Sequence, residues 1–317
     1  MYPPIHNAGA ECMVHALNRF LLQNGWRITI ILPSFPKTMV EGVHVLQFRD
    51  TLRIKIAIER ASIIMSHLRF SDLAVDTAMT TGKPLVLVIH NSFQIPNLQR
   101  YRSLIPKNLY LIHNSHWIKD VYRPFAFHSH ETVLYPPVFP EEFDYAINRK
   151  YVTLVNCKKE KGGQLLIDLA KRMPRVQFLG VLGAYGIQVT EDLPNLRYMK
   201  NTPNTRFFYS QTDILLIPSV YESWGRVAVE AMSLGIPVIA TPTPGLKESL
   251  GDVGIFLDLE NIDEWITTIK RLKRESMTYA TKSEEGKRRA QILHPLKQLI
   301  QTEKWLSGIS KPLLENA

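Results

Sequence analysis

The sequence predicts an α/β protein with two doubly wound parallel sheets in tandem, and three observations lead to this fold class. Short apolar runs alternate with helical patterns throughout the 317 residues, which is typical of parallel α/β architecture. The predicted strands are apolar on both faces, so helices should cover each sheet from both sides. Prolines interrupt the alternation in "YPPVFPEEF" (135–143), where neither a helix nor a central strand can continue. We therefore predict a first domain over 1–137 and a second over 138–294.

The alternation defines the elements of the first domain in order, and then begins again in the second. Expected strands of the first domain are 27–32, 43–48, 62–67, 84–90, 109–113 and 132–135, with helices at 9–24, 50–60, 71–81 and 115–122. Expected strands of the second domain are 151–156, 176–181, 196–200, 214–219, 237–241 and 254–258, with helices at 162–173, 204–211, 225–234, 244–250 and 261–274. The terminal segment 295–317 carries one more amphipathic helix, which we expect to pack back on the first domain.

Composition places the chain among globular proteins with sizeable cores, since 45% of residues are hydrophobic and 21% are charged. The two cysteines, Cys12 and Cys157, lie far apart without CxxC spacing, which argues against a disulfide framework or a zinc site and suits a reducing compartment. The N-terminus lacks the pattern of a secretory signal, and the apolar runs are too short to span a bilayer. We therefore expect a cytoplasmic protein.

The net charge of +9 and the pI of about 9.4 favour anionic partners. Phosphates, an acidic membrane surface and nucleic acid all fit such an excess, so peripheral attachment to a membrane stays open beside a plain cytoplasmic location. Much of the excess lies within 270–291, where the alternative is an ordinary solvated helical face.

The segment "SVYESWGRVAVEAMSLGIPVIATPTPG" (219–245) holds two carboxylates on either side of a glycine turn. Glu222 follows a buried strand, so it should lie at the carboxyl end of a sheet, where doubly wound folds bind ligands. Gly225 begins a helix, whose unpaired N–H groups and positive dipole end favour phosphate, and Arg226 could add a bidentate contact. Glu230, about one turn later, could accept hydrogen bonds from a ribose diol. The alternative is that acidic residues are simply favoured in a first helical turn.

A second helix start of the same kind follows "VNCKKEKGGQLLIDLAKRMP" (155–174). Lys161 stands directly before a helix that glycines begin, at the carboxyl end of another predicted strand. A solvated turn is the alternative for this lysine-rich stretch. Two anion-binding helix starts on one sheet together predict a diphosphate between them, in a cleft between the domains.

These motifs resemble those of the retaining glycosyltransferases of family 4, also called glycosyl transferases group 1. "PSVYESWGRVAVEAMSLGIPVIAT" is similar to the family's E-x7-E signature, and "KGGQLLIDLAKRMPRVQFLGV" to its Lys-Gly phosphate segment. In the first half, "YPPIHNAGAE" resembles its glycine loop and "VIHNSF" its histidine-containing strand end. The resemblance runs from residue 2 to about 258 and implies the GT-B fold, with two Rossmann-like domains facing a cleft.

The resemblance also implies a reaction and its residues. The donor would be a nucleotide-diphosphate sugar, a UDP- or GDP-sugar, with no cofactor and no metal required. Catalytic roles fall on His90, Lys161 and Glu222, although a histidine at a strand end is often structural. The implied donor-binding residues are Gly9, Asn156, Lys158, Lys161, Thr202, Glu222, Ser223, Trp224, Gly225, Arg226, Val227 and Glu230. Acceptor-side candidates are Asn91, Ser92 and His113, while other tyrosines and tryptophans are interpreted as core or rim.

The chain departs from the family pattern at two places. Asn156-Cys157 stands where the family usually has Gly-Arg, so the second phosphate cation is Lys158, Arg226 or absent. The family also begins with a buried strand before its glycine loop, whereas this chain begins at the loop. Either the sequence starts late or another strand fills that place.

The predicted function is a retaining, metal-independent transfer of a sugar to an acceptor hydroxyl of a glycan, a lipid or a nucleic acid. No Asp-x-Asp stands at a convincing strand end to hold a divalent ion, which agrees with that prediction. Two other functions fit the same fold. A nucleotide-sugar epimerase would change its donor without an acceptor, and a non-catalytic nucleotide-sugar-binding protein would consume none.

Overall fold

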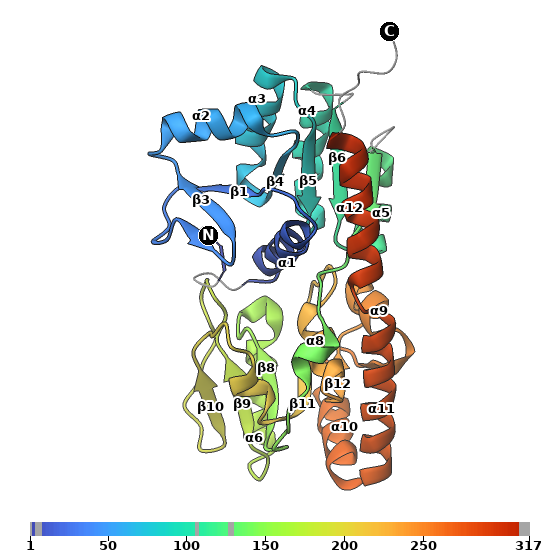
Figure 1. The fold of residues 1–317 in the computed structure, drawn as a ribbon. Coiled ribbons are helices and arrows are strands. Elements are labelled where there is room, and N and C mark those ends of the chain that lie inside the picture. The colour runs from blue at the N-terminus through green and yellow to red at the C-terminus, as the bar shows by residue number, and fades with distance from the viewer. Residues whose placement is uncertain (1, 4–7, 105–107, 126–129, 311–317) are drawn as a thin grey trace. The chain divides into compact units, whose positions relative to one another are not determined.

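The computed structural model describes residues 2–3, 8–104, 108–125 and 130–310, and the chain divides into two compact units (Figure 1). The first unit contains Gly9–Pro137 and the segment that begins at Pro295. The second contains Val138–His294. Each unit has its own core of buried side chains, built from strands and the helices that cover them.

The strands of the first unit form two sheets. One has the order β1-β3-β2 and the other β4-β5-β6-β7. Their bounds are β1 Thr29–Leu32, β2 Met39–Val40, β3 Val43–Gln47, β4 Ile64–His67, β5 Leu85–Ile89, β6 Leu109–His113 and β7 His130–Val133. Every predicted strand of this half is present, and β7 begins two residues earlier than the apolar run alone indicated.

A hairpin departs from the parallel pattern that we predicted. β2 pairs with β3 in the antiparallel sense, and the turn between them places Glu41 and Gly42 at φ 47° and 85°. Two successive positive φ values are typical of the tight turn that joins antiparallel strands. The sequence analysis missed this pair, because it predicted no strand at 39–40. The other pairs of the unit are parallel, as predicted.

The two sheets of the first unit do not pair with each other within the described residues. In the doubly wound order 3-2-1-4, the first strand lies between the second and the fourth, which here are β1 and β4. Among the described residues, β1 pairs only with β3 and β4 only with β5. Within this part of the chain, no other strand fills the place.

Helices α1 Gly9–Gln23, α2 Thr51–Arg60, α3 Ser71–Thr81, α4 Ile95–Leu104, α5 His116–Tyr122 and α12 Leu296–Ser310 complete this unit. The sequence did not predict α4, which is mostly polar and carries a proline in its first turn. Helix α12 is joined to earlier parts of the unit by two hydrogen bonds. Trp26 Nε1 donates to Glu303 Oε1 at 3.1 Å, and the Tyr135 amide donates to Gln298 Oε1 at 2.9 Å.

The second unit is a six-stranded parallel sheet in the order β10-β9-β8-β11-β12-β13. The strands are β8 Tyr151–Val155, β9 Phe178–Val181, β10 Leu196–Met199, β11 Thr212–Ile217, β12 Val238–Ala240 and β13 Ile255–Phe256. This order is the doubly wound 3-2-1-4-5-6 arrangement. From β8, the chain first adds strands on one side of the sheet and then, from β11 on, adds them on the other side. The predicted fold class is confirmed here.

Helices α6 Gly163–Arg172, α7 Arg206–Tyr209, α8 Arg226–Ser233, α9 Pro244–Leu250, α10 Ile262–Arg274 and α11 Ser276–Ile292 cover that sheet. Short 3₁₀ turns lie at η1 Leu68–Phe70, η2 Ser92–Gln94, η3 Arg123–Phe125, η4 Pro140–Phe143, η5 Lys159–Lys161 and η6 Gly251–Val253. Helix α11, part of the stretch interpreted as a solvated face, buries one side and packs against α8. A Cβ added at Gly286 of α11 would lie 3.5 Å from Met232 Cγ of α8, so the two helices are in close contact there.

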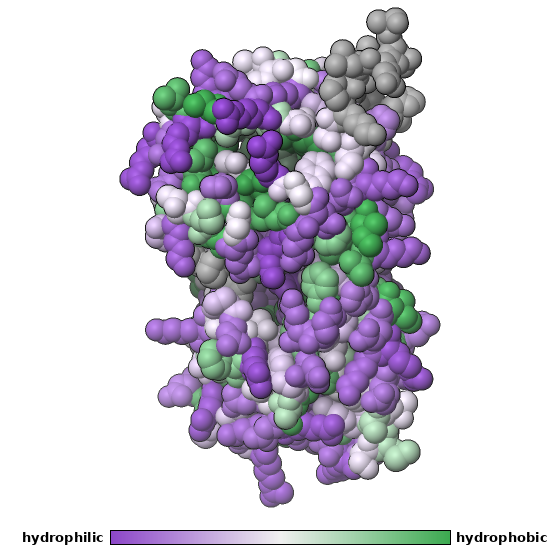
Figure 2. Space-filling view, in the orientation of Figure 1, coloured by the Kyte–Doolittle hydropathy of each residue, from purple (hydrophilic) through white to green (hydrophobic). Residues whose placement is uncertain are grey.

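The surface is mostly hydrophilic on the face that Figure 2 shows, with apolar side chains gathered in separate small areas, as is usual for folded proteins. Within the described ranges, no helix has both the length and the hydropathy that crossing a membrane requires.

Candidate functional site

Two loops of the second unit meet where the strand order reverses. One loop leads from β8 to α6 and the other from β11 to α8. The Val220 amide donates to the Glu160 carbonyl at 3.0 Å, and Lys161 Nζ donates to the Tyr221 carbonyl at 3.0 Å. Ligands of doubly wound sheets bind at this switch point, so both predicted helix starts belong to one site.

Both helices at this site begin with a left-handed glycine. Gly162 precedes α6 at φ 88° and Gly225 precedes α8 at φ 89°, and neither helix start has a side-chain cap. The neighbouring helices α9 and α10 are capped by Thr243 and Asn261. A capping side chain would occupy the N–H groups of a first turn. At these two starts no side chain occupies the N–H groups, although the Gly163 and Ala228 amides donate to the Lys158 and Gly225 carbonyls at 3.0 and 2.9 Å. The remaining N–H groups of the two first turns can receive an anion.

Gly162 is required by its conformation and by its packing. A Cβ at this position would lie 2.2 Å from Pro218 Cγ, at the end of β11. Gly162→Ala should therefore separate the two loops, lower the unfolding temperature and weaken nucleotide binding at least tenfold.

The matched control for that change is Gly25→Ala, at φ 85° with no atom of the described residues within 4 Å of its added Cβ. It introduces the same left-handed strain without the clash. Thermal unfolding and nucleotide titration of both variants measure the packing effect. Equal losses in the two variants would contradict it.

Lys161 and Glu222, predicted to bind different parts of a donor, contact each other in the structure. Lys161 Nζ lies 2.6 Å from Glu222 Oε1, and Ser219 Oγ donates to the same oxygen at 3.0 Å. The two charged side chains are 23% and 19% exposed, so both the pair and its surroundings remain open to a ligand. The Glu222 carboxylate holds the Lys161 ammonium group where the loop that leads to α6 contacts the loop that leads to α8.

Glu230 is buried, with 4% of its side chain exposed. Its Oε2 accepts a hydrogen bond from the Tyr209 hydroxyl at 2.8 Å, and its Oε1 lies 3.2 Å from Arg226 Nη2. Tyr209 also contacts the Val227 carbonyl at 3.2 Å. The carboxylate therefore points back toward the first turn of α8, as side chains on a helix generally do. Its burial exceeds what a solvated first-turn acid requires.

The stretch that departs from the family pattern is tightly packed. Asn156 has φ 74°, a left-handed conformation that asparagine tolerates better than most residues, and its Oδ1 is buried without a hydrogen-bond partner among the described residues. Cys157 is fully buried, and burial raises the pKa of its thiol to about 12. Position 157 thus faces the core. Lys158 Nζ lies 4.0 Å from the centre of the Tyr185 ring and 3.8 Å from Glu160 Oε1.

The other predicted donor-side residues of the second unit lie in the β11–α8 loop, in the first turn of α8 and after β10. Trp224 is buried, and Ser223 and Val227 are half-buried. Thr202 follows β10, and its hydroxyl accepts a hydrogen bond from the Asn204 amide at 3.2 Å. Sequence reasoning missed Gly245, whose added Cβ would lie 2.4 Å from the Glu222 carbonyl oxygen. Its position in "PTPG", directly after a strand, was the available signal.

His90, in the first unit, follows β5 and is 7% exposed. Its ring lies 5.2 Å from that of His67, centre to centre. Burial, and secondarily His67, hold the pKa of His90 well below its usual value, so its imidazole is neutral at neutral pH. His90 Nε2 and His67 Nδ1 are both buried without a hydrogen-bond partner among the described residues. Sequence reasoning missed His67, although adjacent strands end in "SH", "IH" and "IH".

The acceptor-side candidates have separate environments. Asn91 Oδ1 accepts from the Phe93 amide at 2.9 Å and so caps η2, which contains Ser92. His113 is fully buried and its Nε2 lies 3.0 Å from Glu131 Oε2, an environment typical of a structural histidine. Gly9 begins α1, and its added Cβ would meet no described atom within 4 Å.

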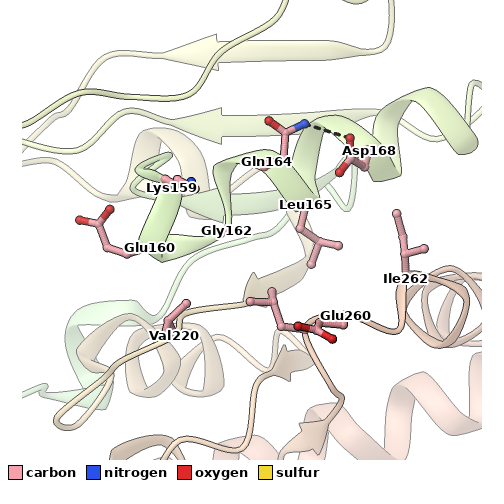
Figure 3. A pocket seen from close by; sticks show the side chains of 10 residues that line it. Lys159, Glu160, Gly162, Gln164, Leu165, Asp168, Val220, Glu260 and Ile262 are labelled. Carbon is pink, nitrogen blue, oxygen red and sulfur yellow. Dashed lines mark hydrogen bonds between the residues drawn. The ribbon is translucent and has the colours of Figure 1, made fainter.

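A groove of about 590 Å³ lies on the other side of the Lys161 loop. Figure 3 shows Leu165 of α6 and Ile262 of α10 pointing toward each other across it, with Val220 at one end. None of the predicted site residues lines it. Across the described part of the chain, no group of three or more His, Cys, Asp or Glu side chains is arranged to hold a metal ion.

Comparison with known proteins identifies a family for the second unit. The family described as "Glycosyl transferases group 1" matches residues 148–289, which include the whole six-stranded sheet. A D-inositol 3-phosphate glycosyltransferase from Rhodococcus opacus is 34% identical over 85 residues. That alignment covers 26% of this chain and spans only 19% of the relative's length.

Solved structures match over nearly the full chain. A sucrose-phosphate synthase from Thermosynechococcus elongatus has a TM-score of 0.76 at 15% identity, covering 95% of this chain and 93% of that one. Anabaena Alr3699/HepE in complex with UDP-glucose has a TM-score of 0.76 at 16% identity, with coverages of 94% and 96%. Such identities establish the fold alone, and that fold is GT-B. The second unit therefore matches the glycosyl transferases group 1 family, and the chain has the GT-B fold over nearly its full length.

Proposed function

We propose that the protein is a retaining glycosyltransferase that moves a sugar from a nucleotide-diphosphate sugar to an acceptor hydroxyl. One observation carries the proposal. The β8–α6 and β11–α8 loops each lead to a glycine-capped helix start, and Lys161, directly before α6, reaches Tyr221 and Glu222 of the other loop. N–H groups and a lysine directed at one place suit a diphosphate. Similarity to a protein solved with UDP-glucose supports a nucleotide sugar as the donor.

The proposed mechanism uses this arrangement without a metal ion. As the bond between the anomeric carbon and the diphosphate breaks, negative charge develops on the departing phosphate. Lys161 and the N–H groups at the two helix starts stabilise that charge, and preorganised donors of this kind usually contribute most to catalysis. The acceptor oxygen bonds to the anomeric carbon on the face from which the diphosphate departs, and the departing phosphate oxygen takes the acceptor's proton. Because the new bond replaces the old one on the same face, the anomeric configuration is retained.

Each carboxylate has its own role in the proposal. Glu222 would exchange its contact with Lys161 for hydroxyls of the transferred sugar once phosphate binds the lysine. Glu230 would accept hydrogen bonds from the ribose diol. His90, as a neutral imidazole, would be able to donate or accept one hydrogen bond to the sugar.

A screen of nucleotide sugars tests the function directly. UDP- and GDP-sugars should raise the unfolding temperature, and the matching donor should yield a glycosylated product from glycan, lipid or oligonucleotide acceptors by mass spectrometry. NMR of the product should show retained configuration, and excess EDTA should leave the rate unchanged. Conversion of the donor without an acceptor would instead establish an epimerase. Binding without turnover would establish a non-catalytic nucleotide-sugar-binding protein.

A further inference from the structure

The carboxylate of Glu230 is held by an aromatic residue that the proposed function does not yet use. Tyr209, the last residue of α7, is fully buried. Its hydroxyl lies 2.8 Å from Glu230 Oε2 and 3.2 Å from the Val227 carbonyl. A hydroxyl has one hydrogen to donate, and the shorter contact with an ionised acceptor is the stronger hydrogen bond.

The Tyr209 hydroxyl can act only as a donor in this position. Burial, and then the charge of Glu230, raises the pKa of the Tyr209 phenol well above its ordinary value. The phenol is therefore neutral at neutral pH. Since a carboxylate has only acceptor oxygens, the hydrogen must lie on the tyrosine.

The ring of Tyr209 is fixed by its neighbours. The ring of Phe208 lies 4.4 Å from it, centre to centre, and the ring of Phe143 packs edge-on at 6.2 Å. A side chain enclosed in this way cannot swing to follow a moving partner. Its hydroxyl thus marks one fixed point, and Glu230 Oε2 is bound to that point.

The two oxygens of Glu230 consequently have unequal freedom. Oε2 is held by a rigid, fully buried phenol, whereas Oε1 faces Arg226, which is 28% exposed and lies at the first position of α8. The Arg226 side chain is partly exposed, whereas that of Tyr209 is fully buried. Oε1 is therefore the oxygen available to a diol at the helix start.

We propose that Tyr209 is a positioning residue for the donor nucleoside, because it fixes the plane of the Glu230 carboxylate so that Oε1 meets the ribose hydroxyls. This inference rests on the proposed function and extends it to a residue outside the glycine turns. The ligand that fits this arrangement is a ribonucleoside diphosphate. A 2′-deoxyribose lacks one hydroxyl and would leave an acceptor oxygen of the buried carboxylate unpaired.

The test compares Tyr209→Phe with Tyr279→Phe. Tyr279 provides a close control, because its hydroxyl also donates a buried hydrogen bond of 2.8 Å, to the Asp213 carbonyl in the same unit. Each variant loses one buried hydroxyl whose hydrogen bond measures 2.8 Å. Both should therefore lose similar thermal stability. Only Tyr209→Phe loses a contact with Glu230.

Calorimetric binding of UDP and of 2′-deoxy-UDP, or of the GDP pair if guanosine is the base, gives the readout. The wild type and Tyr279→Phe should prefer the ribonucleotide by the same factor. In Tyr209→Phe that preference should fall by about tenfold, as expected for the loss of one hydrogen bond to a charged group. With turnover, the KM for the donor should rise while kcat changes little.

An unchanged preference in Tyr209→Phe, with stability reduced as in Tyr279→Phe, would overturn the inference and assign Tyr209 to the core alone. A wild-type protein that binds no nucleotide would overturn the proposed function itself. The two failures are distinguished because the second appears before any substitution is made.

Discussion

Lys161→Ala is expected to reduce the rate of sugar transfer by about two to three orders of magnitude, the loss typical when a preorganised charge-stabilising donor is removed. The lysine supplies a full positive charge where the β8–α6 loop contacts the β11–α8 loop, and the proposed mechanism places the departing phosphate there. The variant also leaves Glu222 without its partner at 2.6 Å. A half-buried carboxylate would then repel the phosphate, so the loss should exceed that of a lysine acting alone.

Lys159→Ala is the control for this change. Lys159 lies two residues earlier in η5, is exposed and lines the groove on the other side of the loop. It removes the same charge from the same short turn. Steady-state rates with the identified donor should fall only for Lys161→Ala, while thermal unfolding stays nearly constant in both. Comparable activity in the two variants would refute the phosphate role of Lys161.

Glu230→Gln is expected to weaken nucleotide binding by about 5- to 150-fold. Tyr209 and Arg226 both donate toward the carboxylate. An amide offers one acceptor oxygen and a donor NH₂ group, so it can satisfy only one of these donors and still less a ribose hydroxyl. Leaving a buried polar group unpaired costs about 1–3 kcal/mol, which corresponds to the expected change in affinity.

Asp213→Asn provides the comparison for Glu230→Gln. Asp213 is also a buried carboxylate, 5% exposed, and its Oδ2 lies 2.5 Å from Lys273 Nζ. Both variants should lose stability in thermal unfolding, because each disturbs a buried ion pair. Calorimetric titration with nucleotide should separate them. Unaltered affinity in Glu230→Gln would remove Glu230 from the ribose site.

The strands and most helices could be predicted from the sequence because their apolar periodicity is strong. Helix α11 could not, since its buried side consists largely of small or polar residues, including Ser283, Gly286 and Ala290. Such residues do not produce a hydrophobic periodicity in the sequence. That they are buried is seen only in the structure, where α8 packs against them. The β2–β3 hairpin was missed for a similar reason, because its first strand, Met39–Val40, is too short to show alternation.

The candidate site was predictable where chemistry follows local pattern and not where it depends on tertiary contact. The order of strand, loop and helix was enough to predict Gly162, Gly225 and Lys161 as site residues. The contact between Lys161 and Glu222 joins residues 61 positions apart, and no spacing rule indicates it. Tyr209 was interpreted as core, which its burial agrees with, but its hydrogen bond to Glu230 required the folded sheet.

The buried thiol of the β8–α6 segment offers a way to observe local motion. Cys157 is enclosed, its pKa is about 12, and its carbonyl accepts the Val189 amide at 2.7 Å. Thiol reagents attack the thiolate, so modification of Cys157 at neutral pH must await local opening of the β8–α6 segment. After replacement of the half-buried Cys12, the rate of Cys157 alkylation measures how often that segment opens. A ligand that stabilises the closed loops would lower this rate, and the donor would need no label.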